Sequence, residues 1–431
     1  MEGGRLSAGA TAAIEDRVLT QVEDCADELV ELASALVRIP SVNPPGEHYR
    51  DCAELLGGVL AGQGYEVDYP VAEERPEHTA DHPRVNVVGL ARGRAERPLV
   101  HLNGHYDVVP AGEGWTVDPF GGEVRDGRLY GRGSADMKAG LASAVFAAEA
   151  IRRAGVELAG SVEISGTVDE ESGGFAGVAH LAETGRVSAD RTDHVIIPEP
   201  LNVDRICVGH RGVYWFKVAS HGRIGHGSMP DLGVNAITHM APLLVRMSEE
   251  LAPEIAGRTT RMPVVPPAAR HGSINLNSIV GGQGGQWPQT PCVADYCEAI
   301  FDRRFLVEEG FDATRDEIAR LVEETAAAAP ERSYEIEDLM VVHPTETPAG
   351  SPLVAALESA IERVLGRRAE QIASPGTYDQ KHFAHIAGVH DCVAYGPGVL
   401  EQAHQPDEWC GVQDMVDAAK VMALAILRLA G

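Results

Sequence analysis

Short apolar segments that suit buried β-strands alternate with segments of helical periodicity, and this alternation restricts the fold more than any other feature of the sequence. Strands are expected at residues 66–69, 85–90, 99–104, 161–168, 194–197 and 392–395. Helices are expected at residues 14–39, 49–63, 138–154, 175–183 and 415–429, and residues 1–13 resemble a loose tail. Strands that alternate with helices in this way predict an α/β fold with a mainly parallel sheet and helices on both faces.

The middle of the chain follows a different pattern. Strands are expected there at residues 212–220, 271–280, 294–304 and 334–342, and helices at residues 235–251 and 314–328. The resulting order βαββαβ is typical of a ferredoxin-like module with an open, largely antiparallel sheet. A chain of 431 residues is also too long for one ordinary core. We therefore expect an inserted domain at residues 208–342 within a larger domain formed by residues 1–207 and 343–431.

Side chains that can bind a metal ion lie at or just beyond the expected strand ends, or, in one case, at the start of a helix. These residues are His105, Asp136, Glu170, Glu171, Glu199 and His404. The carboxyl ends of parallel strands meet at one edge of a sheet, where sites gather. Imidazole and carboxylate ligands without thiolate suit zinc, and also cobalt or manganese. The agreement of separate segments therefore favours a metal site.

One of these strand ends carries an acidic residue beside its histidine. Asp107 follows His105 by two positions, so its carboxylate can orient the histidine ring or the metal that the ring binds. A His-x-Asp triplet is common by chance, so this interpretation depends on the ligands at the other strand ends.

The composition excludes several kinds of partner. The chain has 36 Lys and Arg against 64 Asp and Glu, a formal net charge of −28, which argues against nucleic acid or an anionic membrane as a partner. No apolar run approaches the ~18 residues that span a bilayer, and no secretory signal is visible at the N-terminus. The seven cysteines contain no C-x-x-C pair, as expected for reduced thiols in the cytoplasm.

Seven motifs together carry a family resemblance. GHYDVVP, GRGSADMKAG, TVDEESGG, PEP, GHGSMPDLGVNAI, FDRR and AHQPDEW occur in this order within roughly residues 30–425. The chain resembles the M20 family of metallopeptidases and amidohydrolases, which includes acetylornithine deacetylase, succinyl-diaminopimelate desuccinylase, aminoacylase and the glutamate carboxypeptidases. The resemblance implies a zinc-exopeptidase-like catalytic domain and a hydrolase that cleaves an amide C–N bond.

The resemblance also implies a site with two divalent metal ions, zinc in the first place and cobalt or manganese as alternatives. One metal would bind His105 and Glu199, the other would bind Glu171 and His404, and Asp136 would bridge them. The peptide between Asp136 and the following methionine matches a position that is cis in the family.

Further roles are implied for residues around the metals. Glu170 would be the general base, and Asp107 would support His105. Neighbouring residues of a regular strand face opposite sides, so different roles for Glu170 and Glu171 are reasonable. His226 of the inserted domain would stabilise the oxyanion, often from the partner subunit, and Arg304 would contact a substrate carboxylate.

Two segments bear on the substrate. PGTYDQKHF, which contains Tyr378, Lys381 and His382, matches a substrate-side loop of the family. We expect Tyr378 and Lys381 to bind substrate, and a lysine and a histidine there could bind an anionic group. The stretch GGQWPQTP stands where the family has an Asn-x-x-Pro turn, and it lacks the asparagine.

The leading hypothesis is deacylation of a small N-acyl amino acid or a related carboxylate. Glu199, where other members have aspartate, favours the deacetylase and desuccinylase side of the family. One alternative is deamination of an aromatic amino acid, suggested by GGQWPQTP and Tyr378, and another is dipeptidase or carboxypeptidase activity. A non-catalytic metal-binding or ligand-binding protein of the same fold is the third, although the presence of every ligand and the base argues against it.

The inserted domain would leave one sheet edge unpaired. Exposed edges are usually protected in natural proteins, and two such domains could pair across a two-fold axis. We therefore expect a homodimer through the inserted domain, which would act as lid and dimerisation domain.

Overall fold

The computed structural model describes residues 8–283 and 291–431, and the chain divides into two compact units. Unit 1 consists of Met1–Val208, Thr347–Ile372 and Tyr378–Gly431. Unit 2 consists of Gly209–Glu346 and Ala373–Thr377. Compared with the expected insertion at residues 208–342, unit 2 begins one residue later, extends to Glu346 and also takes in the short segment 373–377.

A mixed sheet of nine strands has the order β1-β2-β6-β3-β7-β15-β8-β13, with β14 paired to β8. The four central strands β6, β3, β7 and β15 are parallel. The strands that flank them, β2 on one side and β8 on the other, are antiparallel. The α/β class is thus confirmed, with a sheet that is parallel at its centre and mixed overall. The strand bounds are β1 Glu66–Asp68, β2 Val87–Ala91, β3 Leu99–His105, β6 Ser161–Thr167, β7 His194–Ile197, β8 Arg205–His210, β13 Thr345–Glu346, β14 Glu370–Ser374 and β15 Cys392–Ala394.

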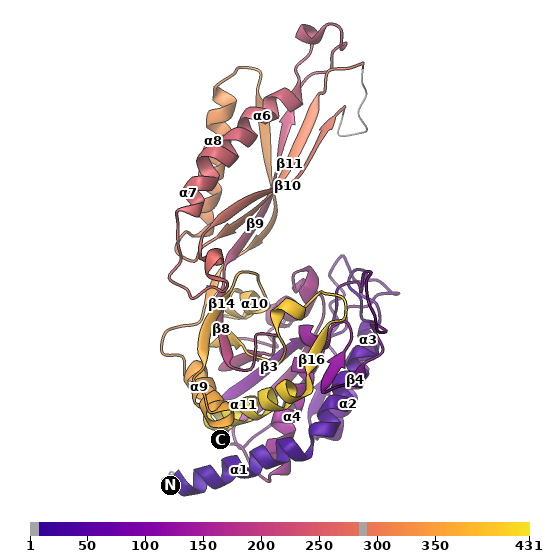
Figure 1. The fold of residues 1–431 in the computed structure, drawn as a ribbon, viewed down its shortest axis with the longest axis vertical. Coiled ribbons are helices and arrows are strands. Elements are labelled where there is room, and N and C mark those ends of the chain that lie inside the picture. Colours follow the sequence, from indigo (N-terminus) through magenta and orange to yellow (C-terminus); the bar gives the residue numbers. More distant parts are fainter. Residues whose placement is uncertain (1–7, 284–290) are drawn as a thin grey trace. The chain divides into compact units, whose positions relative to one another are not determined.

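The first expected helix is in fact two helices. α1 spans Ala8–Asp24 and α2 spans Ala26–Val37, and they meet at an angle at the buried Cys25 (Figure 1). The break allows α1 to pack against both α4 (Ala139–Arg153) and α11 (Val412–Ala430) while α2 follows α4. The expectation of a loose tail is wrong from Ala8 onward, because α1 begins there and continues into a part of the helix whose residues Val18 and Val22 are buried in the core. The remaining helices of unit 1 are α3 Tyr49–Gly62, α5 His180–Glu183, α9 Pro352–Leu365 and α10 Gln380–His385.

Unit 2 has the predicted order βαββαβ. Its antiparallel sheet runs β10-β11-β9-β12, which leaves β10 and β12 at the edges. The helices α6 and α8 cover one face of this sheet, where the stacked rings of Phe216 and Phe301 lie 5.0 Å apart (Figure 1). The bounds are β9 Gly212–His221, α6 Ala236–Arg246, α7 Ala252–Ala256, β10 Ser273–Gly282, β11 Tyr296–Phe305, α8 Phe311–Ala327 and β12 Ser333–Val342.

A small sheet joins two distant parts of unit 1. It has the order β16-β5-β4, with β4 Glu123–Arg125, β5 Arg128–Tyr130 and β16 Trp409–Gly411. The pairing of β16 with β5 brings the loop that contains His404 close to the segment that precedes Asp136. Over the described residues, none of the helices has the length and apolar character needed to cross a bilayer.

Candidate metal centre

Four segments of unit 1 bring potential metal ligands together. His105, the last residue of β3, has its Nε2 atom 3.1 Å from Oδ1 of Asp136. His404 has its Nε2 atom 3.0 Å from Oε1 of Glu171 and 3.6 Å from Oδ2 of Asp136. Ligand atoms of His105, Asp136 and Glu171 all lie within 4.8 Å of one another. The two oxygens of Asp136 therefore face two different histidines, as a bridging carboxylate would require.

Burial acts strongly on the pKa values of the carboxylates in this cluster. Burial raises the pKa of Glu171 to about 7, although the hydrogen bond from His404 acts in the opposite direction. Burial, and then the charge of Asp136, raises the pKa of Glu199 well above its usual range. Burial also acts to raise the pKa of Asp136, but hydrogen bonds with His105 and Glu199 hold it below its usual value. Buried carboxylates and imidazoles in one cluster are a donor set that fits a divalent cation.

Asp107 fixes the turn that carries both glutamates. Its Oδ1 accepts a hydrogen bond from the backbone N–H of Glu170 and its Oδ2 accepts one from that of Glu171, each at 3.1 Å. Asn43 Nδ2 donates to Oδ2 of Asp107 at 3.0 Å. The backbone carbonyl of Asp107 accepts from Nδ1 of His105 at 3.0 Å, which leaves Nε2 of that ring as the metal donor.

A second buried carboxylate, Glu408, orders the segments that carry Asp136 and His404. Its Oε1 accepts hydrogen bonds from the backbone N–H groups of Ala135 at 2.9 Å and Asp136 at 3.1 Å. Its other oxygen forms an ion pair with Arg132, which also donates to the backbone carbonyl of His404 at 3.2 Å. Sequence reasoning did not single out this pair, although Arg132 and Glu408 stand inside two of the motifs.

The peptide bond between Asp136 and Met137 is cis, as predicted.

The predicted base has a cationic neighbour. Lys381 Nζ lies 3.6 Å from Oε1 of Glu170, and both side chains are largely buried. Tyr378 is also buried, and its hydroxyl group donates to Oε1 of Gln380 at 2.7 Å. Substrate binding by Tyr378 and Lys381 stays a prediction, and these internal contacts argue against it.

Two predicted residues lie in unit 2. His226 is exposed, and its Nδ1 accepts a hydrogen bond from the backbone N–H of Ser228 at 3.2 Å, so that Nε2 carries the ring proton and can donate. The guanidinium of Arg304 forms a fork with the carboxylate of Asp302, at 2.8 Å and 2.9 Å. Their predicted roles stay predictions. The altered turn at GGQWPQTP falls largely within residues 284–290, outside the described residues.

Known proteins resemble this chain over most of its length. The family model described as peptidase family M20/M25/M40 matches residues 101–428. A succinyl-diaminopimelate desuccinylase of Methylorubrum extorquens is 30% identical over 397 residues, which cover 89% of this chain and 94% of the relative.

Solved structures agree in fold. An M20 family metallo-carboxypeptidase from Sulfolobus solfataricus is 19% identical, with a TM-score of 0.73 over 93% of this chain and 99% of that chain. A dinuclear metal binding peptidase of the M20 family from Bacillus subtilis is 16% identical, with a TM-score of 0.69 over 94% of this chain and 99% of that chain.

The resemblance seen in the motifs is thereby confirmed, and the alternative of a non-catalytic protein is set aside. The chain belongs to peptidase family M20/M25/M40 and is a hydrolase that acts on amide bonds.

Proposed function

We propose that the protein is a two-metal amidohydrolase that removes the acyl group from a small N-acyl amino acid or a related carboxylate. The observation that carries this proposal is the position of Asp136, whose Oδ1 lies 3.1 Å from His105 Nε2 and whose Oδ2 lies 3.6 Å from His404 Nε2. The desuccinylase relatives support the substrate class, because they align with about nine-tenths of the chain.

In this proposal His105 and Glu199 hold one metal ion, Glu171 and His404 hold the other, and Asp136 lies between them. Nitrogen and oxygen donors without thiolate favour zinc, and cobalt or manganese would also fit. The metal pair, when bound, supplies Lewis acidity that polarises the amide carbonyl.

The remaining steps belong to the side chains of the protein. Glu170 accepts a proton from the attacking water and passes it to the leaving nitrogen. Asp107 holds the turn that presents Glu170, through the 3.1 Å hydrogen bond from its backbone N–H. His226 donates from Nε2 to the oxyanion, within one chain or across a dimer, and Arg304 contacts the substrate carboxylate.

Replacement of the base tests the mechanism. Glu170→Gln should lower kcat for release of succinate or acetate by about 10²–10⁴-fold, the usual contribution of a general base. The metal content should stay near two ions per chain, because Glu170 is not among the proposed ligands. Full activity in this variant would sink the mechanism.

A substrate panel separates the proposed activity from its alternatives. N-succinyl, N-acetyl and N-formyl amino acids, dipeptides and aromatic amines should be compared with the metal-loaded enzyme. Release of acylate supports deacylation, release of amino acids from dipeptides supports peptidase activity, and release of ammonia from an aromatic amine supports deamination. The Tyr378 contacts weaken the last alternative, because its hydroxyl group already donates to Gln380.

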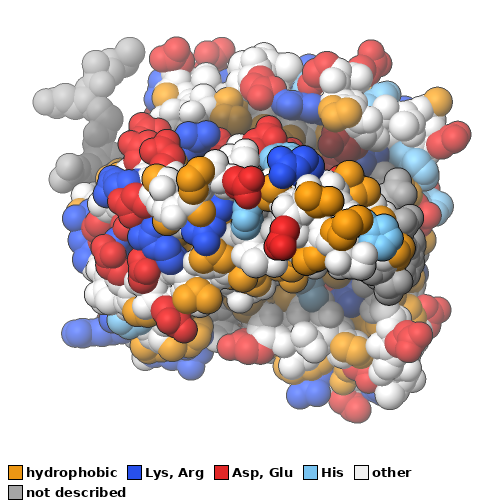
Figure 2. Space-filling model, turned by 90° about the horizontal axis from the view of Figure 1, so that it is seen from above, with side chains coloured by type: hydrophobic (Ala, Val, Ile, Leu, Met, Phe, Trp, Pro, Cys, Tyr) orange, Lys and Arg blue, Asp and Glu red, His pale blue; other side chains and the backbone are white. Residues whose placement is uncertain are grey.

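We also propose a homodimer formed through the edge strand β10 of unit 2. Leu276, Ile279 and Val280 on this strand are between 41% and 48% exposed. Two residues of α6, Ile237 and Val245, are exposed as well. Hydrophobic side chains are visible among charged ones on the face drawn in Figure 2. An unpaired strand edge beside exposed apolar side chains is a surface that a second copy could cover.

The dimer can be tested at the strand edge. Ile279→Lys should shift the mass measured by light scattering from dimer to monomer at micromolar concentration. Leu339→Lys on β12, the opposite edge strand, is the matched control because Leu339 is similarly exposed at 43%. A wild-type protein that is already monomeric would contradict the proposal.

We further infer a reducing, cytoplasmic location, since all seven cysteines are free.

A further inference from the structure

One face of the two central strands is polar although it is fully buried. β3 and β6 pair in parallel, with His101 opposite Glu163, Asn103 opposite Ser165, and His105 opposite Thr167. All six side chains are at most 2% exposed. The opposite face of the same strands carries the apolar residues Val100, Leu102, Val162 and Ile164. Buried polar groups destabilise a fold unless they are bonded, so such a row calls for a role. We name this row the polar stripe.

The polar stripe forms a continuous chain of short contacts. His101 Nδ1 lies 3.0 Å from Glu163 Oε1, and His101 Nε2 lies 2.7 Å from Ser165 Oγ. Ser165 Oγ donates to Oδ1 of Asn103 at 2.7 Å. Asn103 Nδ2 then donates to Oδ2 of Asp379 at 3.2 Å. The stripe thus ends on a carboxylate that belongs to a different part of unit 1, immediately before α10.

Asp379 connects the stripe to the predicted base. Its side chain is buried, and its Oδ1 has no hydrogen-bond donor among the described residues. Lys381 Nζ lies 4.0 Å from this Oδ1 and 3.6 Å from Oε1 of Glu170. The ammonium group therefore stands between two carboxylates, one fixed by the stripe and the other expected to move protons.

The segment around Asp379 is also fastened to the turn that carries Glu170. His382 Nε2 lies 2.7 Å from the backbone carbonyl of Gly173. Gly174 has a φ of +77°, and a Cβ atom there would come within 2.5 Å of Asp379 Oδ1. Only glycine permits this approach, so the two segments meet closely on both sides of the Lys381 contact.

We infer that Asp379 and Lys381 are positioning residues for Glu170: the polar stripe holds Asp379, and the Lys381 ammonium, paired with Asp379, holds one carboxylate oxygen of Glu170. The inference rests on the proposed function, because it needs Glu170 to be the base. A base must stay within hydrogen-bond reach of the proton it takes, and small displacements are costly to the rate. Lys381 is only 5% exposed, which suits a supporting role better than contact with substrate.

The burial of these groups is consistent with this arrangement. Burial raises the pKa of Asp379 to about 7, while the charge of Lys381 acts to lower it. The ammonium group is thus the nearby charge that favours the ionised form of Asp379, and geometry places the same group beside Glu170.

Steady-state kinetics of the metal-loaded enzyme on an N-succinyl amino acid test the inference. Lys381→Met should lower kcat by about 10–100-fold, the usual loss for a group that supports a site residue. KM and the metal content should stay near their wild-type values. Lys381→Arg, which keeps the charge, should recover part of the loss. A variant Lys381→Met with raised KM and unchanged kcat would show that Lys381 binds substrate, and would overturn the inference.

The double variant tests whether the two residues act as one unit. Asp379→Asn should also lower kcat, and its effect should not multiply with that of Lys381→Met, because both remove the same support. Fully multiplicative effects would contradict the pairing. If Glu170→Gln itself keeps full activity, the proposed function fails, whereas an active-site defect in Glu170→Gln without any in Lys381→Met rejects only the positioning role.

A milder change tests the stripe if the charged variants do not fold. Ser165→Ala removes the link between His101 and Asn103 and should lower kcat with unchanged metal content. Ser161→Ala is the matched control, because Ser161 lies on the same face of β6 but donates to the backbone carbonyl of Ala95 at 3.0 Å. Equal kcat values for the two variants would overturn the role of the stripe.

Discussion

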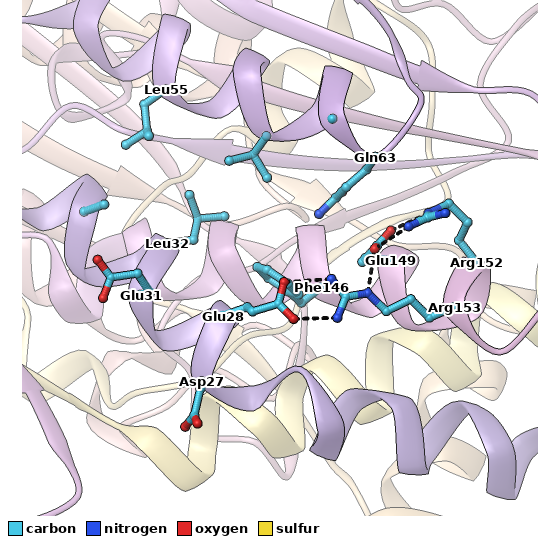
Figure 3. Close-up of a pocket in the computed structure, with 13 residues that line it drawn as sticks. Asp27, Glu28, Glu31, Leu32, Leu55, Gln63, Phe146, Glu149, Arg152 and Arg153 are labelled. Atoms are coloured by element: carbon cyan, nitrogen blue, oxygen red, sulfur yellow. Dashed lines mark hydrogen bonds and ion pairs between the residues drawn. The ribbon is translucent and has the colours of Figure 1, made fainter.

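Two clusters of charged side chains in unit 1, each built around at least one buried carboxylate, differ in their balance of charge. The first lines a pocket between α2, α3 and α4 (Figure 3), where Glu149 is 1% exposed. Arg152 and Arg153 each donate to the Glu149 carboxylate at 2.7 Å, and Arg153 also donates to Glu28 at 2.6 Å and 2.7 Å. In the metal centre, the proposed ligands Asp136 and Glu171 instead contact histidine rings, and the predicted base Glu170 contacts the ammonium group of Lys381.

The difference is visible in the acidity of the groups. Burial acts to raise the pKa of Glu149, but the hydrogen bonds from Arg152 and Arg153 hold it below its usual value. At two carboxylates of the metal centre burial prevails: the pKa of Glu171 rises to about 7 and that of Glu199 rises well above its usual range, while contacts with His105 hold the pKa of Asp136 low. A buried acid that the arginines of its own chain neutralise is structural, whereas a cluster of acids with raised pKa values is suited to an external cation.

The largest expected effect is the loss of the bridging carboxylate. Asp136→Asn should strip most of the metal from the dialysed protein and lower the hydrolysis rate by more than about a hundredfold, the upper end for groups that only support a ligand. The reason is that both histidines face its two oxygens.

Metal analysis after dialysis, together with the rate of acylate release, measures this effect. Glu149→Gln is the control and should keep both metal and activity, because Glu149 belongs to the arginine-neutralised cluster. Full metal content in Asp136→Asn would remove the distinction between the two clusters.

The second effect concerns stability. Glu149→Gln should lower the free energy of unfolding by about 2–3 kcal/mol, the scale of lost hydrogen bonds to charged groups. Arg153 is 29% exposed and would keep Glu28 as a partner, so the loss should stay below that of an isolated buried charge. Denaturant unfolding measures the change, and kcat should be unaffected. A variant as stable as the wild type would mean that the cluster is not structural.

The third effect is the change of stability with pH, which has opposite signs in the two regions. Asp379 has a pKa raised from 3.8 to about 7, so the native metal-free protein holds a proton there that the unfolded chain releases. Its native stability should fall as the pH rises through this range. In the presence of chelator, the Tm of Asp379→Asn should therefore rise relative to that of the wild type as the pH increases from about 5 to about 8.

Glu149 supplies the opposite case. Its pKa lies below 4.5, so its stabilisation is present above that pH and is lost as the pH falls through the native pKa. The Tm deficit of Glu149→Gln should persist from about pH 5 to pH 8 and shrink in stronger acid. Thermal scans across this range check both variants, and equal signs would contradict the comparison.

The sequence predicted the segments of the metal centre better than their supporting contacts. His105 and Glu171 could be expected to meet, because they follow the ends of strands that a parallel sheet places side by side. The part played by Lys381 could not be expected, because it depends on how the segment before α10 packs against the turn at Glu170. Tyr378 illustrates the same limit, since a loop tyrosine gives no sign that its hydroxyl group is used inside the protein.

The sequence likewise predicted some elements of the fold and missed others. The apolar period of residues 14–39 is continuous, so the sequence could not reveal that the chain turns at Cys25 to follow α4. The central parallel strands were readable as apolar runs bounded by loops. The sequence did not predict β8 and β14, because the pairing of these two strands joins residues that are far apart in the sequence.

The smallest expected effect distinguishes the two arginines of the structural cluster. Arg152 is 58% exposed and contacts Glu149, whereas Arg153 is 29% exposed and contacts both Glu149 and Glu28. Arg152→Ala should cost less than about 1 kcal/mol, because Arg153 still neutralises Glu149. Removing both arginines should cost more than the sum of the single changes, since Glu149 would then be buried without a cation. Denaturant unfolding of the two single variants and the double variant measures this coupling, and strict additivity would show that the arginines do not share the neutralisation of Glu149.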